Sequence, residues 1–171
     1  AREAVKAAVF QEANKPLSIE DVDIIDPRPG EVLVRTSCSG VCHSDLHFVD
    51  GLWQLPMSCV LGHEAAGIVE AIGEGVTYVQ PGDRVIMSFR PFCGKCYYCR
   101  EKGLMMKCRH LKKYGHDSCA EPPHFIGGFA EYCYITPGTC VIKVPDNLTD
   151  EEVAPANCAL ATVVAGWEAA D

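Results

Sequence analysis

Short runs of β-branched, aromatic and other apolar residues recur along the chain, separated by turn-forming residues. They lie at 4–10, 18–25, 31–40, 65–73, 83–89, 128–135 and 139–145. The connecting sequences include PRPG, QPGD and TPG, which are typical of turns. Strands at such intervals, with few helical patterns between them, favour a β-barrel or sandwich over a doubly wound sheet. The pattern therefore predicts a mainly β fold.

Helical patterns occur at two places. The sequence HSDLHFVDG, residues 43–51, predicts a short helix capped by Ser44. A second helix is predicted after Thr149, a candidate N-cap that acidic residues follow in the first turn. Its continuation over 153–167 is uncharged but only 15 residues long, and it contains Pro155. Because that run is too short to span a bilayer, it predicts a core helix.

Size, charge and cysteine content narrow the class of protein. A chain of 171 residues is long enough for one domain with a sizeable core. The net charge of −8 argues against a nucleic-acid partner, and no segment indicates a membrane partner. Eleven cysteines without a signal-peptide pattern predict a reducing compartment, here the cytoplasm. Four of these cysteines lie beside strand-like runs and are predicted to fill the core: Cys38, Cys59, Cys133 and Cys140.

A cysteine-rich segment from 91 to about 124 interrupts the β pattern. Cys93, Cys96 and Cys99 have the spacing C-x2-C-x2-C, and Cys108 follows after eight intervening residues. Gly94 can adopt the positive φ that such a metal-binding turn often needs. Four thiolates fill the tetrahedral shell of zinc completely, so the site would be structural.

Other interpretations of this cysteine cluster stay open at the level of sequence. Cys119 is a second choice for the fourth ligand. A redox C-x-x-C pair is disfavoured, because that motif normally begins a helix in a βαβ unit. Four thiolates also suit an iron–sulfur cluster.

A second constellation is spread over three segments. GVCHSDLH supplies Cys42, GHE supplies His63, and ANCALAT supplies Cys158. Two cysteines and one histidine leave one tetrahedral position of zinc open to water or substrate, which is the arrangement of a catalytic site. Each of these residues alone would be weak evidence, since a single cysteine or histidine is usually structural.

The motifs around these residues make the sequence recognisable. GHEAAGIVEAIGEGV (62–76), GVCHSDLH, PGDRV, CGKCYYC, GGFAEY and CALAT are all present. In these motifs the chain resembles the zinc-dependent medium-chain alcohol dehydrogenases, specifically their N-terminal GroES-like catalytic domain. One departure is the loop before Cys108, which is one residue longer than is usual in the family.

The resemblance implies a fold and a domain organisation. Residues 1–152 would form a GroES-like, partly open β-barrel with short helices, including a structural-zinc lobe at 91–124. Residues 153–171 would begin the helix that leads to a nucleotide-binding domain. No G-x-G-x-x-G follows a strand in this chain, and GEGVTY (73–78) has only the first two glycines. We therefore expect the 171-residue chain alone to be inactive.

The resemblance also implies roles for residues around the dispersed metal site. Ser44 would contact the zinc-bound alcohol, and His47 would end a proton relay. Glu64 would lie behind the metal, and Asp45 would hydrogen-bond to the zinc histidine and fix its orientation.

Three further positions match cofactor and substrate contacts of the family. His43 would touch the cofactor pyrophosphate, Thr162 would pack against the nicotinamide, and Trp53 would line the substrate cleft. Taken alone, His43 and His47 read as exposed loop histidines, and only their register with Cys42 suggests these roles.

The activity implied is interconversion of an alcohol and an aldehyde or ketone, by alkoxide formation at zinc and hydride transfer to NAD or NADP. Two zinc ions per chain, a small-molecule substrate and a homo-oligomeric full-length enzyme are expected. One alternative is a related dehydrogenase acting on a polyol, an amino alcohol or a phosphonate-derived alcohol. Another is a non-catalytic zinc-binding GroES-like module.

Overall fold

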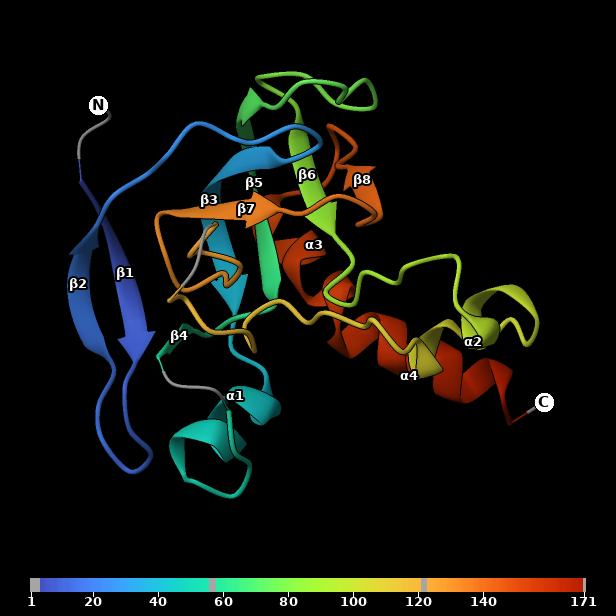
Figure 1. The fold of residues 1–171 in the computed structure, drawn as a ribbon, viewed down its shortest axis with the longest axis horizontal. Coiled ribbons are helices and arrows are strands. Elements are labelled where there is room, and N and C mark those ends of the chain that lie inside the picture. Colours follow the sequence, from blue (N-terminus) through green and yellow to red (C-terminus); the bar gives the residue numbers. More distant parts are fainter. Residues whose placement is uncertain (1–3, 56–57, 121–122, 171) are drawn as a thin grey trace.

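The structure, a computed structural model, describes residues 4–55, 58–120 and 123–170. Its strands form two open antiparallel sheets and do not close into a barrel (Figure 1). The smaller sheet has the order β2 (Ser18–Val22), β1 (Val5–Phe10), β4 (Cys59–Val60). The larger has the order β7 (Tyr132–Ile135), β3 (Val32–Gly40), β5 (Glu64–Ile72), β6 (Arg84–Met87), β8 (Val141–Lys143). The predicted mainly β architecture is confirmed.

The main core lies between these sheets, because alternate strand residues point inward. In β1, Val5, Ala7 and Val9 are buried while Lys6 is exposed. Ala7 and Val9 pack with β3, β5 and β7 residues such as Leu33, which has no exposed surface. Each of the seven predicted runs contains a strand. The two-residue strand β4 was not predicted, since so short a run has no recognisable period.

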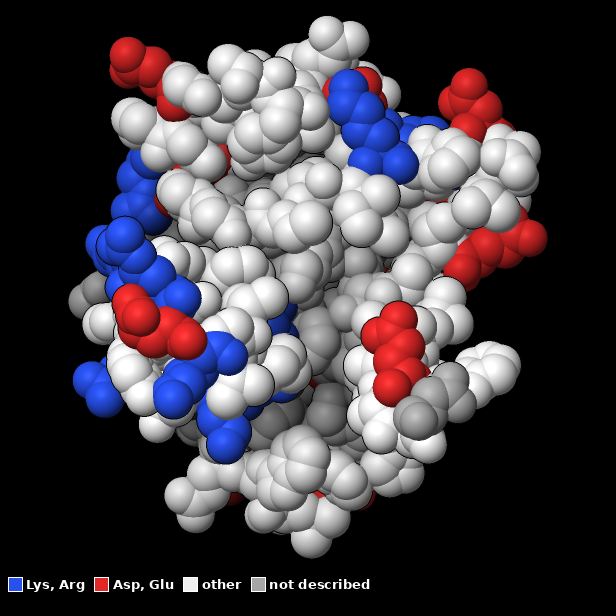
Figure 2. Space-filling view, turned by 90° about the vertical axis from the view of Figure 1, so that its right-hand side faces the viewer, with Lys and Arg blue, Asp and Glu red and all other residues white. Residues whose placement is uncertain are grey.

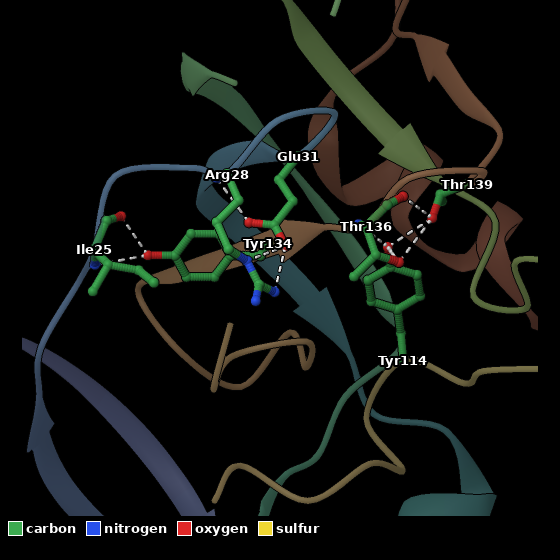
Figure 3. Close-up of polar contacts among 7 residues, drawn as sticks. All are labelled: Ile25, Arg28, Glu31, Tyr114, Tyr134, Thr136 and Thr139. Atoms are coloured by element: carbon green, nitrogen blue, oxygen red, sulfur yellow. Dashed lines mark hydrogen bonds and ion pairs between the residues drawn. The ribbon is translucent and has the colours of Figure 1, made fainter. Parts of the chain in front are cut away.

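Partly buried polar contacts join the connection between β2 and β3 to the larger sheet (Figure 3). The Tyr134 hydroxyl donates to the Ile25 carbonyl at 2.7 Å and accepts from the Ile25 amide at 3.0 Å. Arg28 donates through Nη2 to Oε1 of Glu31 at 2.6 Å. The Tyr134 contacts hold the connection between β2 and β3 against β7, and the Arg28–Glu31 pair braces that connection internally.

A second network joins the segment after the cysteine-rich lobe to the turn after β7. The hydroxyl of Tyr114 lies 2.8 Å from Oγ1 of Thr139 and accepts a hydrogen bond from the Thr136 amide at 2.8 Å. Burial raises the pKa of Tyr114 to about 12, so its hydroxyl stays protonated. The network positions the chain just before His116, whose ring lies beside that of His63.

The helices are short. They comprise α1 (His43–Val49), α2 (Tyr97–Arg100), η1 (Met105–Lys107), α3 (Asp150–Val153), η2 (Ala154–Asn157) and α4 (Ala159–Glu168). The cap of α1 is Cys42 and not Ser44, which lies inside the first turn. Thr149 caps α3 as predicted, accepting from the Glu152 amide at 3.3 Å. Among the described residues, no helix is long and apolar enough to cross a membrane.

Two expectations about the C-terminal part and the cysteines were wrong. The uncharged run 153–167 is not one core helix: Pro155 lies in the first turn of η2, and the backbone turns again at Cys158 before α4. No residue of α4 is buried, and Trp167 is 72% exposed. Cys59 and Cys133 are buried and Cys38 is half-buried against the core, but Cys140 is exposed. Cys140 precedes the edge strand β8, where one side of the backbone faces solvent.

Candidate metal centres and catalytic site

Four cysteines of the lobe converge on one point. The sulfur atoms of Cys93, Cys96, Cys99 and Cys108 all lie within 4.8 Å of one another. The Cys96 and Cys99 sulfurs are 3.5 Å apart, and those of Cys96 and Cys108 are 3.9 Å apart. Zinc–sulfur bonds of about 2.3 Å in a tetrahedron place sulfurs about 3.8 Å apart. The cluster thus has the dimensions of a single tetrahedral ion, whereas a multi-iron cluster distributes its cysteines over several metal atoms.

Backbone amides donate hydrogen bonds to two of these sulfur atoms. The Cys93 and His110 amides donate to the Cys108 sulfur at 3.4 and 3.3 Å, and the Cys96 amide donates to Cys93 at 3.3 Å. Backbone hydrogen bonds lower the pKa of Cys96 to about 6 and also lower that of Cys108, whereas burial and the neighbouring thiols raise the pKa of Cys99 to about 12. Gly94 has a φ of 67°, as the predicted metal-binding turn requires.

The lobe geometry decides between the candidate fourth ligands. Cys108 is in the cluster, at the end of η1. Cys119 lies elsewhere, with its sulfur 3.4 Å from Oγ of Ser58. None of the four thiols is in a disulfide. The four-thiol set therefore fits a structural zinc.

The dispersed set converges as well. Ligand atoms of Cys42, His63 and Cys158 lie within 4.8 Å of one another, and the two sulfurs are 4.0 Å apart. Nε2 of His63 is 3.4 Å from Oγ of Ser44, which stands at the edge of the set. The donor set fits zinc, because two thiols and one imidazole occupy three of its four tetrahedral positions.

Buried Asp45 joins two of the ligand segments. Its Oδ2 accepts from the Cys42 amide at 3.0 Å, and its Oδ1 accepts from the Gly62 amide at 3.3 Å. Oδ1 is also 3.5 Å from Nδ1 of His63, within ion-pair distance but beyond a well-formed hydrogen bond. Gly62 has a φ of 88°, and a Cβ there would lie 2.5 Å from the ring of Phe129. The turn that presents His63 thus needs glycine.

Two buried side chains, Asn157 and Glu64, hold the segment that contains Cys158. Asn157 accepts from the Met87 amide at 3.1 Å and donates to the Ala65 carbonyl at 2.8 Å. Glu64 accepts through Oε1 from the Ala159 amide at 3.0 Å. The carboxylate of Glu64, at the start of β5, therefore lies against the start of α4, next to Cys158. Asn157 was not singled out from sequence, because its two partners become neighbours only in the folded sheet.

The ionisable groups of this set influence one another. Burial and the nearby Cys42 raise the pKa of Cys158 to about 11. Burial opposes ionisation of Cys42, but hydrogen bonds from Ser44 and the neighbouring His63 lower its pKa overall. Burial opposes the charged form of His63 too, yet Asp45 and Cys42 outweigh it and the pKa of His63 is raised. Zinc must displace these protons, so its binding will release them.

The remaining predicted residues lie around the set. His43 and His47 are on helix α1 rather than in a loop, with ring centroids 4.7 Å apart. The His47 ring is also 4.7 Å from that of Trp53, which is 51% exposed and lines a hollow of about 350 Å³. Thr162 lies on α4 and lines a separate apolar hollow of about 480 Å³.

Sequence reasoning did not single out three side chains near this set. The rings of Phe89 and His116 are 5.1 and 5.2 Å from the ring of His63. Arg90 follows, with its guanidinium 5.6 Å from the centre of the Phe89 ring. They come from irregular segments, where no periodicity indicates which side chains point inward. His116 is half-buried with both ring nitrogens inaccessible to solvent, which the exposed-looking sequence around it, with two preceding lysines, does not indicate.

Comparison with known proteins shows the family of the chain. A family model described as "Alcohol dehydrogenase GroES-like domain" matches residues 28–146. The chain belongs to this family. As a GroES-like domain it is 41% identical over 160 residues to an alcohol dehydrogenase of Geobacillus stearothermophilus, covering 91% of this chain and 44% of that protein.

Solved structures show the same GroES-like domain. An alcohol dehydrogenase from Thermotoga maritima is 32% identical with a TM-score of 0.90, covering 96% of this chain and 47% of that one. An acetophenone reductase from Geotrichum candidum, solved in complex with NAD, is 33% identical with a TM-score of 0.84, covering 100% of this chain and 49% of the other. The chain thus spans about half the length of the relatives it matches.

Proposed function

We propose that this chain is the catalytic domain of a zinc- and nicotinamide-dependent dehydrogenase that interconverts an alcohol and an aldehyde or ketone. The observation that carries the proposal is the convergence of Cys42, His63 and Cys158 on one point with Ser44 at its edge. A purely structural metal site would use a fourth protein ligand. Relatives named as alcohol dehydrogenases support the same reaction class.

The proposed metals have different tasks. Cys93, Cys96, Cys99 and Cys108 would hold a structural zinc, and Cys42, His63 and Cys158 a catalytic one. When bound there, zinc supplies a Lewis acid for the substrate oxygen, and NAD or NADP supplies the hydride acceptor.

The residues around the catalytic set would move the proton. Oγ of Ser44 would accept the substrate hydroxyl proton as it passes its own proton on. His47 is three positions later on α1 and therefore on the same helix face, where it would take up that proton and release it to solvent. Asp45 would keep His63 oriented, and Glu64 would hold the Cys158 segment in place.

The cofactor would lie across the exposed end of α1 and the hollow beside α4. His43 is exposed at the first turn of α1 and would meet the pyrophosphate, while Thr162 would meet the nicotinamide. Trp53 would line the path of the substrate.

The test uses the full-length protein that contains this chain. Elemental analysis should give two zinc ions per chain, and alcohol oxidation should depend on NAD or NADP. Cys42→Ser should abolish turnover and remove one zinc, while Cys140→Ser, at an exposed thiol outside both clusters, should change neither. Full activity of Cys42→Ser would refute the catalytic assignment.

A further inference from the structure

Buried ring nitrogens without a protein partner gather at His63 and His116. Nδ1 of His63 and both ring nitrogens of His116 are buried and have no hydrogen-bond partner among the described residues. The two rings lie close together, with centroids 5.2 Å apart. Burial of a polar group that makes no hydrogen bond costs free energy, so such a group calls for an explanation.

The two nitrogens of His63 face different surroundings. Nε2 lies 3.4 Å from Oγ of Ser44, on the side of the catalytic set. Nδ1 lies 3.5 Å from Oδ1 of Asp45, which is too far for a well-formed hydrogen bond. When Nε2 binds zinc, Nδ1 carries the proton of the neutral ring. That N–H needs an acceptor, because the acceptor fixes the orientation of a metal-binding imidazole.

Asp45 is already engaged by two backbone amides. Its Oδ2 accepts from the Cys42 amide at 3.0 Å, and its Oδ1 accepts from the Gly62 amide at 3.3 Å. These bonds hold the carboxylate in place, so a direct contact with Nδ1 of His63 would require one of them to lengthen. A group between Asp45 and His63 could join them without that loss.

His116 is held against the turn that presents His63. Gly115, the residue before it, has a φ of 72°, and a Cβ there would lie 2.7 Å from the Gly62 carbonyl oxygen. Glycine thus lets the two segments approach closely. On the side away from His63, the His116 ring packs against that of Phe48, with centroids 4.7 Å apart. The ring of His116 is therefore fixed beside Nδ1 of His63.

The distances suit one water molecule between these three side chains. One ligand atom from each of Asp45, His63 and His116 lies within 4.8 Å of the other two. Three atoms that each lie about 2.8 Å from a common point, a usual hydrogen-bond length, are up to about 4.8 Å apart. A metal ion would instead sit about 2.0–2.1 Å from each nitrogen and would share His63 with the catalytic zinc. The spacing therefore favours a water.

Charged side chains of the neighbouring lobe do not supply the acceptor. Residues 90–113 hold eight of the 15 Lys and Arg residues and one acidic residue, Glu101. Figure 2 shows Lys and Arg gathered at the surface, on one flank of the face that carries the lobe. Because ammonium and guanidinium groups only donate hydrogen bonds, these residues cannot accept the N–H of His63.

We propose that His116 is a positioning residue for the catalytic zinc ligand: with Asp45 it holds one ordered water that orients the His63 ring. The water would accept the Nδ1–H of His63 and donate to Asp45 and to the unprotonated nitrogen of His116. The inference uses the proposed function only in taking Cys42, His63 and Cys158 as a zinc site. Outer partners of this kind typically change metal affinity by about 10- to 100-fold.

A crystal structure of the full-length zinc-loaded protein tests the water directly. It should show one water within about 3.2 Å of Nδ1 of His63, a carboxylate oxygen of Asp45 and a ring nitrogen of His116. A direct Asp45–His63 hydrogen bond with no water at His116 would overturn the inference. So would a third metal ion bound at these three residues.

Variants of the same full-length protein test the role. His116→Phe keeps a ring between His63 and Phe48 but removes both nitrogens, so chelator competition should show about tenfold weaker zinc binding at the catalytic set. The lobe zinc should be unaffected. His116→Gln restores an acceptor and a donor, and should recover part of the affinity. His110→Phe makes the same substitution at an exposed histidine and should leave both zinc affinities at their wild-type values.

A spectroscopic measurement separates positioning from general stability. With cobalt(II) in place of the catalytic zinc, the visible absorption bands report the arrangement of the ligands. They should shift in His116→Phe and return toward the wild type in His116→Gln. Unchanged bands and affinity in His116→Phe, or equal loss of both zinc ions, would overturn the inference. Failure of the dehydrogenase proposal appears separately, as a wild type that binds zinc at this set and oxidises no alcohol.

Discussion

Asn157 positions the third ligand of the catalytic set although it binds no metal. It is 6% exposed and is hydrogen-bonded through both ends of its amide, to Met87 on β6 and to Ala65 on β5. The adjacent Cys158 is therefore held in place by hydrogen bonds to the two central strands β5 and β6 of the larger sheet. A ligand on an otherwise exposed helical segment becomes fixed in this way.

Asn157→Ala should lower the free energy of unfolding by about 2–4 kcal/mol, because it leaves a buried amide and a buried carbonyl unpaired. It should also weaken zinc binding at Cys42, His63 and Cys158 while the lobe zinc is retained. Chemical denaturation and chelator competition measure the two effects. Asn147→Ala, at an exposed asparagine of the preceding turn, should change neither. Equal effects of the two variants would contradict this role.

For single residues, the sequence predicted which side chains could bind metal better than it predicted which side chains are buried. The ligand types and spacings indicated both metal sites. By contrast, Cys140 was expected in the core because adjacent apolar residues do not reveal which side of an edge strand faces solvent. His116 and Arg90 could not be identified, since the rings that contact them, His63 and Phe89, become their neighbours only in the folded chain.

Among the elements, the cysteine-rich lobe depends most on its metal site. Its helices α2 and η1 have four and three residues, and neither has a buried side chain. Cys108 is the buried member of the four-cysteine set. The sulfur cluster thus replaces a hydrophobic core for this segment, as in small zinc-stabilised modules.

Cys96→Ser should therefore unfold the lobe locally, whereas Cys42→Ser should leave it folded. Hydrogen exchange should show lost protection confined to about 91–113 in the first variant, with β3 and β5 still protected. In the second variant, protection of the lobe should match that of the wild type. Loss of the whole fold in Cys42→Ser, with an intact lobe in Cys96→Ser, would reverse the roles assigned to the two sites.

An ion pair ties α3 to the larger sheet. Arg84 of β6 donates through Nη2 to Oδ1 of Asp150 at 2.7 Å, and Asp150 begins α3. Burial alone would raise the pKa of Asp150, but hydrogen bonds from Arg84 and Ser37 outweigh it and the pKa is lowered. A carboxyl with a lowered folded-state pKa stabilises the fold above its unfolded pKa of about 3.9 and loses that effect as the pH falls through the folded-state value.

Asp150→Asn should consequently reduce the free energy of unfolding by about 1–2 kcal/mol at pH 7. The difference from the wild type should shrink below about pH 4, as Asp150 itself becomes protonated. Denaturation curves between pH 3 and 7 measure it. Asp146→Asn, at an exposed aspartate nearby, should give a small difference throughout. A difference that persists undiminished at pH 3 would exclude the ion pair as its cause.

Strands were predictable as elements because alternation and turn residues bound them. The helical region after Thr149 was only partly predictable. Its start has a clear cap, but the break at Pro155 and Cys158 is imposed by Asn157, whose partners lie on distant strands. Tertiary contacts thus interrupted a run, 153–167, whose uncharged sequence indicated one continuous helix.

For the molecule as a whole, the pairing order of the strands could not be read from sequence. β3 lies between β7 and β5, which follow it at very different separations along the chain. By contrast, the excess of positive charge in residues 90–113 can be read directly from the sequence.

The 171-residue chain by itself should bind NAD no tighter than about millimolar. His43 on α1 and Thr162 on α4 are both exposed, so neither can anchor the pyrophosphate, and the chain has no Gly-rich motif at a strand–helix turn. Calorimetric titration with NAD measures this, and the full-length protein is the control. Saturable binding at micromolar NAD would place the nucleotide site within this chain.

The contact between Cys42 and Cys158 also has a mechanical consequence. Their sulfurs are 4.0 Å apart although 116 positions separate them in sequence, and α4, which follows Cys158, buries none of its own side chains. An ion shared by the two thiols would cross-link the start of α1 to the start of α4, in addition to the hydrogen bonds of Asn157 and Glu64. The residence time of that ion would then help to set how often α4 moves away from the rest of the molecule.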